Sequence, residues 1–379
     1  MRSLSLPRCR PPLVLGGRLP VGLALLALAA CAGVSPRPEV LAAQEPPPAA
    51  ADVDPAHVTA GENEARLLLS GRRFGAAIAA ARAVLALDPR SARARAVLGL
   101  AQVQSALAVD PPDLFGQHQG DGETQLALRL SPQDPLVARL RGETLAAIGH
   151  LAAAAAVAEE ALARQAPSDL PDYVELVEAA AQWRYELGEE QSALPHLQEL
   201  ARRRPDDAAA HFRIGSCLLR TATDAASAAA ASRAFARCAE LSPGDDDAHL
   251  AVVAALARAA ELAHAAGDEP AAKTHVAAAE RAAAAAAERF AQSAEAEFRL
   301  GVLAEQREDG AAARAAYRRA LDRDPQHLGA LLNLARLLAP QDQDPAVARD
   351  LWRRALAIDA ERGGLDADER RNLQARVGS

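Results

Sequence analysis

The sequence is short of aromatic residues, which make up 3% of its 379 positions as 2 Trp, 3 Tyr and 6 Phe. Cores of stacked rings are therefore not expected. Strand-rich folds are disfavoured, because the aromatic and β-branched residues that favour strands are scarce. The chain is filled instead by 98 alanines, the best helix formers and the smallest apolar side chains. We predict many helices that each bury little area, arranged in two or three domains or in a repeat array.

Lysine is almost missing as well, since Lys273 is the single one among 42 basic residues. The 50 acidic residues give a net charge of -8. No basic stripe is visible, so we expect no nucleic-acid partner. The abundance of Arg and Ala is typical of GC-rich coding and indicates no function.

Signatures of catalysis are also absent from the sequence, which has no Gly-rich phosphate loop and no His-Glu-x-x-His, Cys-x-x-Cys or Gly-x-Ser-x-Gly motif. One polar, Gly-containing stretch, residues 111–123, departs from the surrounding pattern. We expect a loop at Gln117 to Glu123, because glycines interrupt helices. An enzyme or ion site in this insertion is a remote alternative. The prediction is no enzymatic activity, no cofactor, no bound metal and no small-molecule substrate.

The N-terminus has the layout of a secretory signal. Four arginines precede the short apolar run at residues 21–30, which is far below the ~20 residues that a spanning helix needs. Leu28-Ala29-Ala30-Cys31 resembles the bacterial lipobox. That resemblance implies that residues 1–30 are a lipoprotein signal peptide and that Cys31 becomes the acylated first residue. Later Ala-rich runs are interrupted by charge, so no further membrane span is expected.

Residues 31–57 combine the lipid-attachment Cys31 with a stretch rich in Pro and Ala. Such a composition predicts an extended tether rather than a folded element. In bacterial lipoproteins an Asp after the Cys favours retention in the inner membrane, and Ala32 stands there. The expected location is therefore the outer membrane, with the chain facing the periplasm and attached to the membrane through Cys31.

From residue 58 the sequence repeats itself, with apolar helical stretches that end at a proline. A proline just past a helix end is favourable, because it cannot continue the hydrogen-bond ladder. The separations between these stops are 43, 35, 38, 38 and 82 residues, the last being two units. The stops are Pro89, Pro132, Pro167, Pro205, Pro243 and Pro325.

Within each unit the spacing resembles the tetratricopeptide repeat, a 34-residue helix–turn–helix with small residues at positions 8, 20 and 27. The clearest copy, residues 294–327, carries Gly301, Ala313, Tyr317, Ala320 and Pro325 at positions 8, 20, 24, 27 and 32. The resemblance implies an all-α, right-handed superhelical solenoid of about seven to eight repeats over residues 58–361. Residues 362–379 are expected to form a capping helix and tail. An irregular Ala-rich bundle is the alternative.

The resemblance also implies a function, since such arrays bind a partner segment along a concave groove. By resemblance, positions 2, 5, 9 and 12 of the first helix of each repeat line that groove. Exposed aromatics among carboxylates would suit a mixed apolar and basic segment. Phe212 and Phe298 have the alternative of packing between repeats. The groove residues expected in repeats four, five, seven and eight are Glu175, Glu178, Gln182, Tyr185, Phe212, Phe298, Glu305, Leu332 and Arg336.

The sequence thus predicts a non-enzymatic protein–protein interaction scaffold, lipid-anchored on the periplasmic side of a bacterial envelope. A pilotin-like assembly factor for a type IV pilus or secretion system is the alternative. Two cysteines of the fifth repeat, Cys217 and Cys238, could form a disulfide in an oxidising compartment or remain buried thiols.

Overall fold

The computed structural model describes residues 46–47, 53–290, 292–340 and 343–378, and throughout these ranges the regular secondary structure is α-helical. The predicted signal peptide and Cys31 lie outside the described residues. The helices are α1 (Pro55–Ser70), α2 (Phe74–Leu87), α3 (Ala92–Leu107), α4 (Leu114–Leu130), α5 (Pro135–Ala147), α6 (Leu151–Ala163), α7 (Pro171–Glu186), α8 (Glu190–Arg203), α9 (Ala208–Arg220), α10 (Ala225–Leu241), α11 (Asp246–Ala265), α12 (Glu269–Arg289), α13 (Ala294–Gln306), α14 (Gly310–Arg323), α15 (Leu328–Leu338), α16 (Pro345–Arg362) and α17 (Ala367–Gly378).

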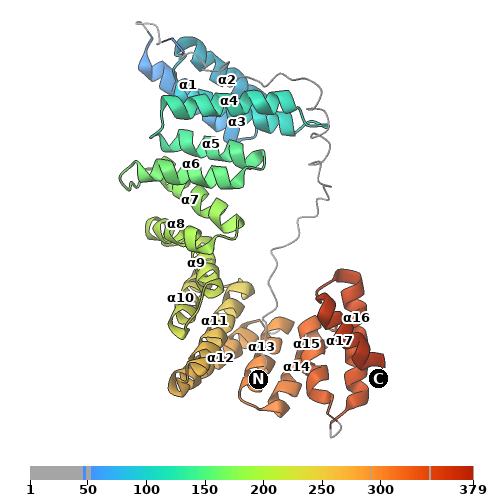
Figure 1. The fold of residues 1–379 in the computed structure, drawn as a ribbon. Helices are drawn as coiled ribbons and strands as arrows, with labels where there is room; N and C mark the ends of the chain where they lie inside the picture. The colour runs from blue at the N-terminus through green and yellow to red at the C-terminus, as the bar shows by residue number, and fades with distance from the viewer. Residues whose placement is uncertain (1–45, 48–52, 291, 341–342, 379) are drawn as a thin grey trace, which may run out of the picture. The chain divides into compact units, whose positions relative to one another are not determined.

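Helices α1 to α16 pair into eight successive hairpins, from α1 with α2 to α15 with α16. Each hairpin packs on the next one through its second helix, as α2 does on α3 and α14 on α15. Figure 1 shows the hairpins following one another along the chain. The predicted all-α solenoid of helix–turn–helix repeats is confirmed.

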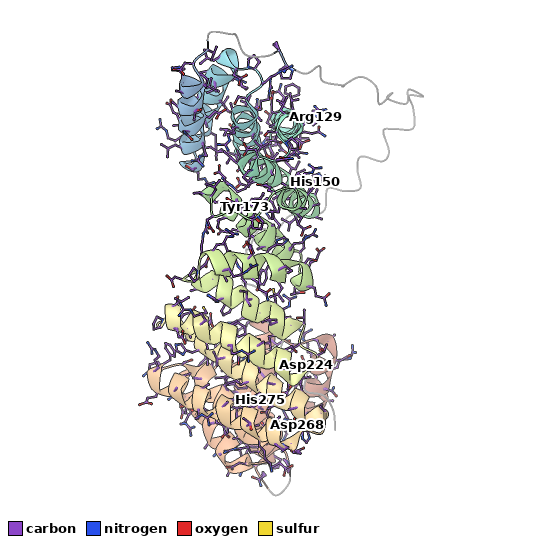
Figure 2. All side chains as sticks on the ribbon, turned by 90° about the vertical axis from the view of Figure 1, so that its left-hand side faces the viewer. Arg129, His150, Tyr173, Asp224, Asp268 and His275 are labelled. Carbon is purple, nitrogen blue, oxygen red and sulfur yellow. The ribbon has the colours of Figure 1, made fainter. Side chains whose placement is uncertain are left out.

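Most helices begin at an Asp or Ser whose side chain accepts a hydrogen bond from the first turn, which satisfies an otherwise unpaired donor. Asp224 accepts from the backbone N–H of Ser227 at 2.7 Å, and Asp268 accepts from that of Ala271 at 3.0 Å. Figure 2 labels both capping residues. The six prolines that predicted the repeat ends all lie in connections between helices.

Small residues allow the two helices of a hairpin to approach closely. A Cβ atom placed on Gly215 would lie 2.7 Å from the ring of Phe235, and one on Gly301 would lie 2.4 Å from the ring of Tyr317. Position 8 therefore has to remain small where it faces an aromatic side chain. The two alanines predicted at positions 20 and 27 of residues 294–327, Ala313 and Ala320, are fully buried with 0% exposure, and so are Ala65, Ala77, Ala154, Ala181 and Ala193 of other hairpins.

The expectation of a loop at Gln117 to Glu123 is wrong, because helix α4 runs without interruption through these residues. Gly120 allows a close helix crossing, because a Cβ on it would lie 2.3 Å from the carbonyl oxygen of Gly99 on α3. Arg141 of α5 also donates to the backbone oxygen of Asp121 at 3.0 Å and forms an ion pair with its carboxylate. The stretch is therefore part of the packed array rather than a separate site.

Helix α11 is long and apolar enough to cross a membrane by length and composition, contrary to the expectation for later Ala-rich runs. In this fold it packs against α10, α12 and α13, and seven of its residues are buried. It is a core helix of the sixth hairpin, whose helices are longer than those of the other hairpins.

The last helix, α17, packs on α16 and is held there by a buried carboxylate. Leu365 and Leu373 join the apolar cluster of the last two hairpins. Asp359 of α16 accepts from Nε of Arg370 at 2.5 Å and from the backbone N–H of Leu365 at 2.9 Å. These two donors hold the pKa of Asp359 below its ordinary value, so this carboxylate stays ionised and paired at neutral pH.

Candidate partner-binding groove

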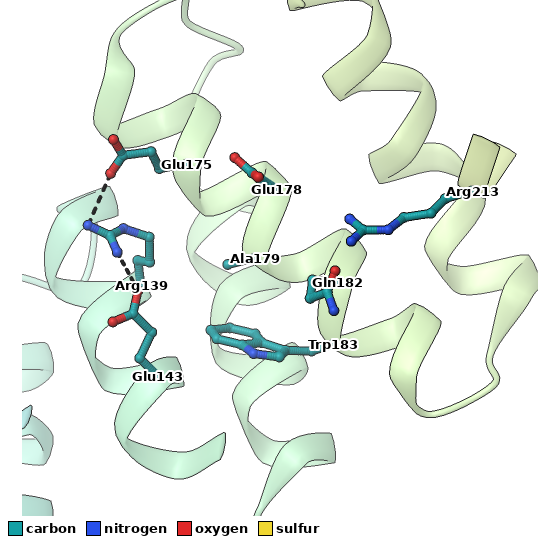
Figure 3. A pocket seen from close by; sticks show the side chains of 8 residues that line it. All are labelled: Arg139, Glu143, Glu175, Glu178, Ala179, Gln182, Trp183 and Arg213. Atoms are coloured by element: carbon teal, nitrogen blue, oxygen red, sulfur yellow. Dashed lines mark hydrogen bonds and ion pairs between the residues drawn. The ribbon is translucent and has the colours of Figure 1, made fainter. Parts of the chain in front are cut away.

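The first helices of hairpins three, four and five, α5, α7 and α9, contribute the side chains that line one pocket. Its volume is about 500 Å³, and it is open to solvent. Figure 3 shows the lining side chains projecting from the three helices. They are Arg139, Glu143, Glu175, Glu178, Ala179, Gln182, Trp183 and Arg213.

Trp183 and Ala179 supply the apolar part of this pocket. The Trp183 side chain is largely buried, with 7% exposure, because its ring covers Gly142 of α5. A Cβ on Gly142 would lie 2.2 Å from the ring, so a glycine is needed at this position for the indole of α7 to pack against α5. Only a small part of Trp183 therefore remains exposed, with charged residues around it.

The three carboxylates of the pocket are all paired with guanidinium groups. Arg139 forms ion pairs with Glu143 and, at 3.0 Å, with Glu175. Glu178 is paired at 2.6 Å with Nη1 of Arg204, which follows α8. Arg139 is shared by two carboxylates and neutralises only one of their two charges, whereas Arg204 balances Glu178; the pairs hold these side chains in place across successive helices.

Arg213 differs from the other charged residues of the pocket. Its guanidinium carbon lies 6.0 Å from the centre of the Tyr185 ring, a cation–π contact. Within the described parts of the chain, no carboxylate forms an ion pair with it. The pocket therefore contains one guanidinium that is oriented by an aromatic ring and has no anionic partner.

The predicted groove residues of repeat four are brought together by the fold. Glu175, Glu178 and Gln182 line the pocket. Tyr185 lies further along α7, is partly buried against the cluster that contains Cys217, and contacts Arg213.

The two predicted groove phenylalanines pack between helices instead. Phe212 lies edge-on to Phe235, with ring centres 5.2 Å apart, and is partly buried. Phe298 has 9% exposure, and its ring centre lies 4.8 Å from that of His327 and 5.7 Å from that of Tyr317. For Phe298 the structure supports the alternative of packing between repeats, because α14 and α15 cover its ring.

The remaining predicted residues lie in the last two hairpins and form a separate polar cluster. Glu305 of α13 accepts from the Tyr317 hydroxyl at 2.7 Å and forms an ion pair with Arg336 of α15. Asn333 donates to the same hydroxyl at 3.1 Å, and Leu332 is partly buried. Burial and the bond to Glu305 raise the pKa of Tyr317. This cluster joins three helices, and its polar atoms are used within the fold.

A sequence profile described as tetratricopeptide repeat matches residues 63–107, 178–246, 264–327 and 304–362, together more than half of the chain. The chain belongs to the tetratricopeptide repeat family. No curated protein matches its sequence.

Among solved structures, one titled "Structure of Naa15/Naa10 bound to HypK-THB" has a TM-score of 0.51 and 12% identity. It covers 84% of this chain, which spans 46% of that one, and shows a shared fold. A tetratricopeptide repeat protein from Parabacteroides merdae ATCC 43184 has a TM-score of 0.44, 15% identity and coverage of 73% of this chain and 98% of that one. YrrB, described as a TPR protein with an unusual peptide-binding site, has a TM-score of 0.42 and 18% identity, with coverage of 55% and 95%.

Five of the residues that line the pocket were not predicted from the sequence: Arg139, Glu143, Ala179, Trp183 and Arg213. With Gly142 at position 8 of the third repeat, Arg139 and Glu143 occupy positions 5 and 9, so extending the groove rule to that repeat would have found them. Trp183 and Arg213 occupy repeat positions that are not among the four predicted to line the groove. Their presence depends on how α7 and α9 are rotated against their neighbours, which repeat spacing does not specify.

The described residues of this tetratricopeptide array contain no group of three or more His, Cys, Asp or Glu side chains arranged to hold a metal ion. Cys217 and Cys238 are both buried and are not bonded to each other. Burial raises the pKa of Cys217 to about 11 and also raises that of Cys238. Both therefore behave as unreactive core thiols at neutral pH.

Proposed function

We propose that this chain is a non-enzymatic interaction scaffold, anchored through lipid on Cys31 to the periplasmic side of a bacterial outer membrane. Its α5–α7–α9 pocket binds a segment of a partner protein. The binding proposal rests on this pocket. It is lined by the first helices of three successive tetratricopeptide repeats, which place charged side chains around Trp183. Helical repeat arrays bind partner segments along such surfaces.

The anchoring proposal rests on the lipobox-like Leu28-Ala29-Ala30-Cys31 and the Pro- and Ala-rich residues that follow it. Each buried methylene of an acyl chain contributes roughly 0.8 kcal/mol, so more than one chain gives stable attachment. Replacement Cys31→Ala should abolish labelling by radioactive palmitate and release the chain from the membrane fraction. Unchanged processing and unchanged membrane attachment of this variant would exclude a lipoprotein.

The binding proposal is tested by cross-linking in cells, with a photoreactive amino acid at Gln182 in the pocket. The matched control carries the same amino acid at Arg233, which is exposed on the second helix of hairpin five. A partner held in the pocket should be captured from position 182 and not from 233. The same products from both positions, or none from 182, would contradict the proposal. The identity of the captured protein distinguishes a general scaffold from a pilotin-like assembly factor.

A further inference from the structure

The turn between α3 and α4 gathers exposed apolar side chains. Leu114 is 76% exposed, Phe115 is 70% exposed and Val109 is 51% exposed. In the parts of the chain that the structure describes, seven large apolar residues are exposed, and these three lie within seven consecutive positions. Phe115 is also the single exposed aromatic residue there. Exposed apolar side chains that stand alone need no explanation, but a cluster of them marks a contact surface.

This apolar tip, residues 109–115, is an ordered part of the second hairpin. The backbone N–H of Asp113 donates to the carbonyl oxygen of Ala106 at 2.9 Å. The Asp113 carboxylate accepts from the backbone N–H of Phe115 at 3.0 Å and so caps α4. The turn spans six residues, whereas the corresponding turns of hairpins one, three and four span three. The longer turn holds the apolar side chains at the edge of the array in a fixed conformation.

The small size of the apolar tip argues against a second protein as its occupant. Stable protein–protein interfaces bury roughly 800 Å² on each partner, which three side chains cannot supply. A membrane surface sets no such requirement when the chain is already attached to it, because the contact then forms at a high effective concentration. Leu and Phe are also the side chains with which interfacial segments enter the boundary between headgroups and acyl chains.

The proposed lipid anchor lies within reach of the apolar tip. Arg90, just before α3, donates from Nε to the carbonyl oxygen of Pro46 at 2.7 Å, which places Pro46 beside the start of α3. From there α3 runs for 16 residues, or about 24 Å, toward the tip. Fourteen residues separate Cys31 from Pro46, and a chain of that length spans at most about 50 Å. One bilayer can therefore hold both the acyl chains and the tip.

Resting on the lipid anchor of the proposed function, we propose that the apolar tip inserts Leu114, Phe115 and Val109 into the surface of the membrane that holds Cys31. The lipid at this contact is zwitterionic, because the tip also exposes the Asp110 and Asp113 residues, whose carboxylates anionic headgroups would repel. The acyl chains attach the protein, and the tip determines which edge of the array faces the bilayer.

The test locates the apolar tip in the full-length lipidated chain, reconstituted into phosphatidylcholine vesicles. The environment-sensitive fluorophore nitrobenzoxadiazole is attached to the thiol of Phe115→Cys. Cys217 and Cys238 are buried and do not compete for the label. Fluorescence from position 115 should rise several-fold on reconstitution and should be quenched by lipids that carry a spin label near the headgroup.

Two matched controls carry the same fluorophore at positions that are exposed elsewhere. Gly122→Cys places it further along α4, and Leu170→Cys places it at a side chain as exposed as Phe115, before α7. Both controls should keep the fluorescence of a label in water. Circular dichroism verifies that the three labelled proteins have the same helix content.

A substitution in the apolar tip gives the magnitude. With the fluorophore at Val109→Cys, the double replacement Leu114→Ser and Phe115→Ser should lower the ratio of inserted to free tips about ten-fold or more, since it removes two large apolar side chains from the membrane contact. Leu170→Ser, which removes an equally exposed apolar side chain outside the tip, should leave that ratio unchanged.

Three results would overturn the inference while leaving the lipid anchor intact. The first is a label at position 115 that stays in water although the chain is attached to the vesicles, and the second is an unchanged ratio in the double variant. The third is a fluorescence rise that needs no vesicles and grows with protein concentration, which would identify a second copy of the chain as the occupant. A wild-type chain that incorporates no radioactive palmitate would instead contradict the anchor itself.

Discussion

Replacing Gly120 by Ala should destabilise the second hairpin, although alanine is the better helix former. In the crossing of α3 and α4, a Cβ at this position would lie 2.3 Å from the backbone oxygen of Gly99 and 2.7 Å from a side-chain methyl of Val103. Ordinary contacts between carbon and carbonyl oxygen are about 3.3 Å or longer. The two helix backbones would therefore have to move apart by roughly 1 Å.

The expected magnitude follows from two opposing effects. Gly→Ala in a helix stabilises by about 1 kcal/mol, and overpacking a close contact costs about 1–3 kcal/mol or more. The clash is with backbone atoms, which cannot rotate away, so the cost should prevail. Gly122 is the matched control, because it is exposed in the same helix and a Cβ there meets nothing within 4 Å. Gly122→Ala should stabilise by up to about 1 kcal/mol.

Urea unfolding followed by circular dichroism measures the overall change for both variants. Because each repeat contacts mainly its neighbours, the effect should concentrate locally. Amide hydrogen exchange of peptides from α3 and α4 should accelerate in Gly120→Ala and not in Gly122→Ala. Equal stability of the two variants would refute the close crossing, and with it the placement of α4.

Three further outcomes are expected. Phe298→Ala should lower stability by about 3–5 kcal/mol, because its ring is buried between hairpins; a fully stable variant in urea unfolding would show that the ring is not part of the core. The folded-state pKa of Asp359 is lowered, so its contribution to stability is present above the unfolded pKa and is lost as pH falls through the folded pKa. The protection of α17 amides, taken relative to the intrinsic exchange rate at each pH, should therefore fall on acidification, and Arg370→Ala should remove much of this dependence. Cys217 and Cys238 should resist alkylation in the native chain and react together after denaturation, whereas failure to react in denaturant without reductant would reveal a disulfide.

Much of the fold could be predicted from local properties of the sequence. The high alanine content predicted helices, and the recurrent prolines predicted where the helices end. Both effects are local and do not depend on residues far away in the sequence. Small residues at regular spacing predicted close hairpins. The same local reasoning failed at Gly120, because a glycine weakens an isolated helix but is required where another backbone passes within contact distance.

The candidate site was predictable only in part. The position rule found Glu175, Glu178 and Gln182, which share the groove-facing side of α7 and line the pocket. It misplaced Phe298, since an apolar ring at a groove position can turn toward the next hairpin and be covered there. Arg213 was not found, because its place in the pocket depends on how α9 is rotated against its neighbours, which repeat spacing does not specify.

The sequence by itself determined that this protein is an all-helical repeat array with short hairpins and with alanine or glycine at their crossings. Those features follow from the helix propensity of alanine, from the regular spacing of small residues and from the inability of proline to continue a helix. Tertiary structure alone decided which side chains of different repeats meet, because ion pairs such as Arg204 with Glu178 join residues from separate helices. Those pairings change the charge that the pocket presents: its three carboxylates are balanced by Arg139, Arg204 and Arg213, so the acidic surface suggested by its residues is close to neutral.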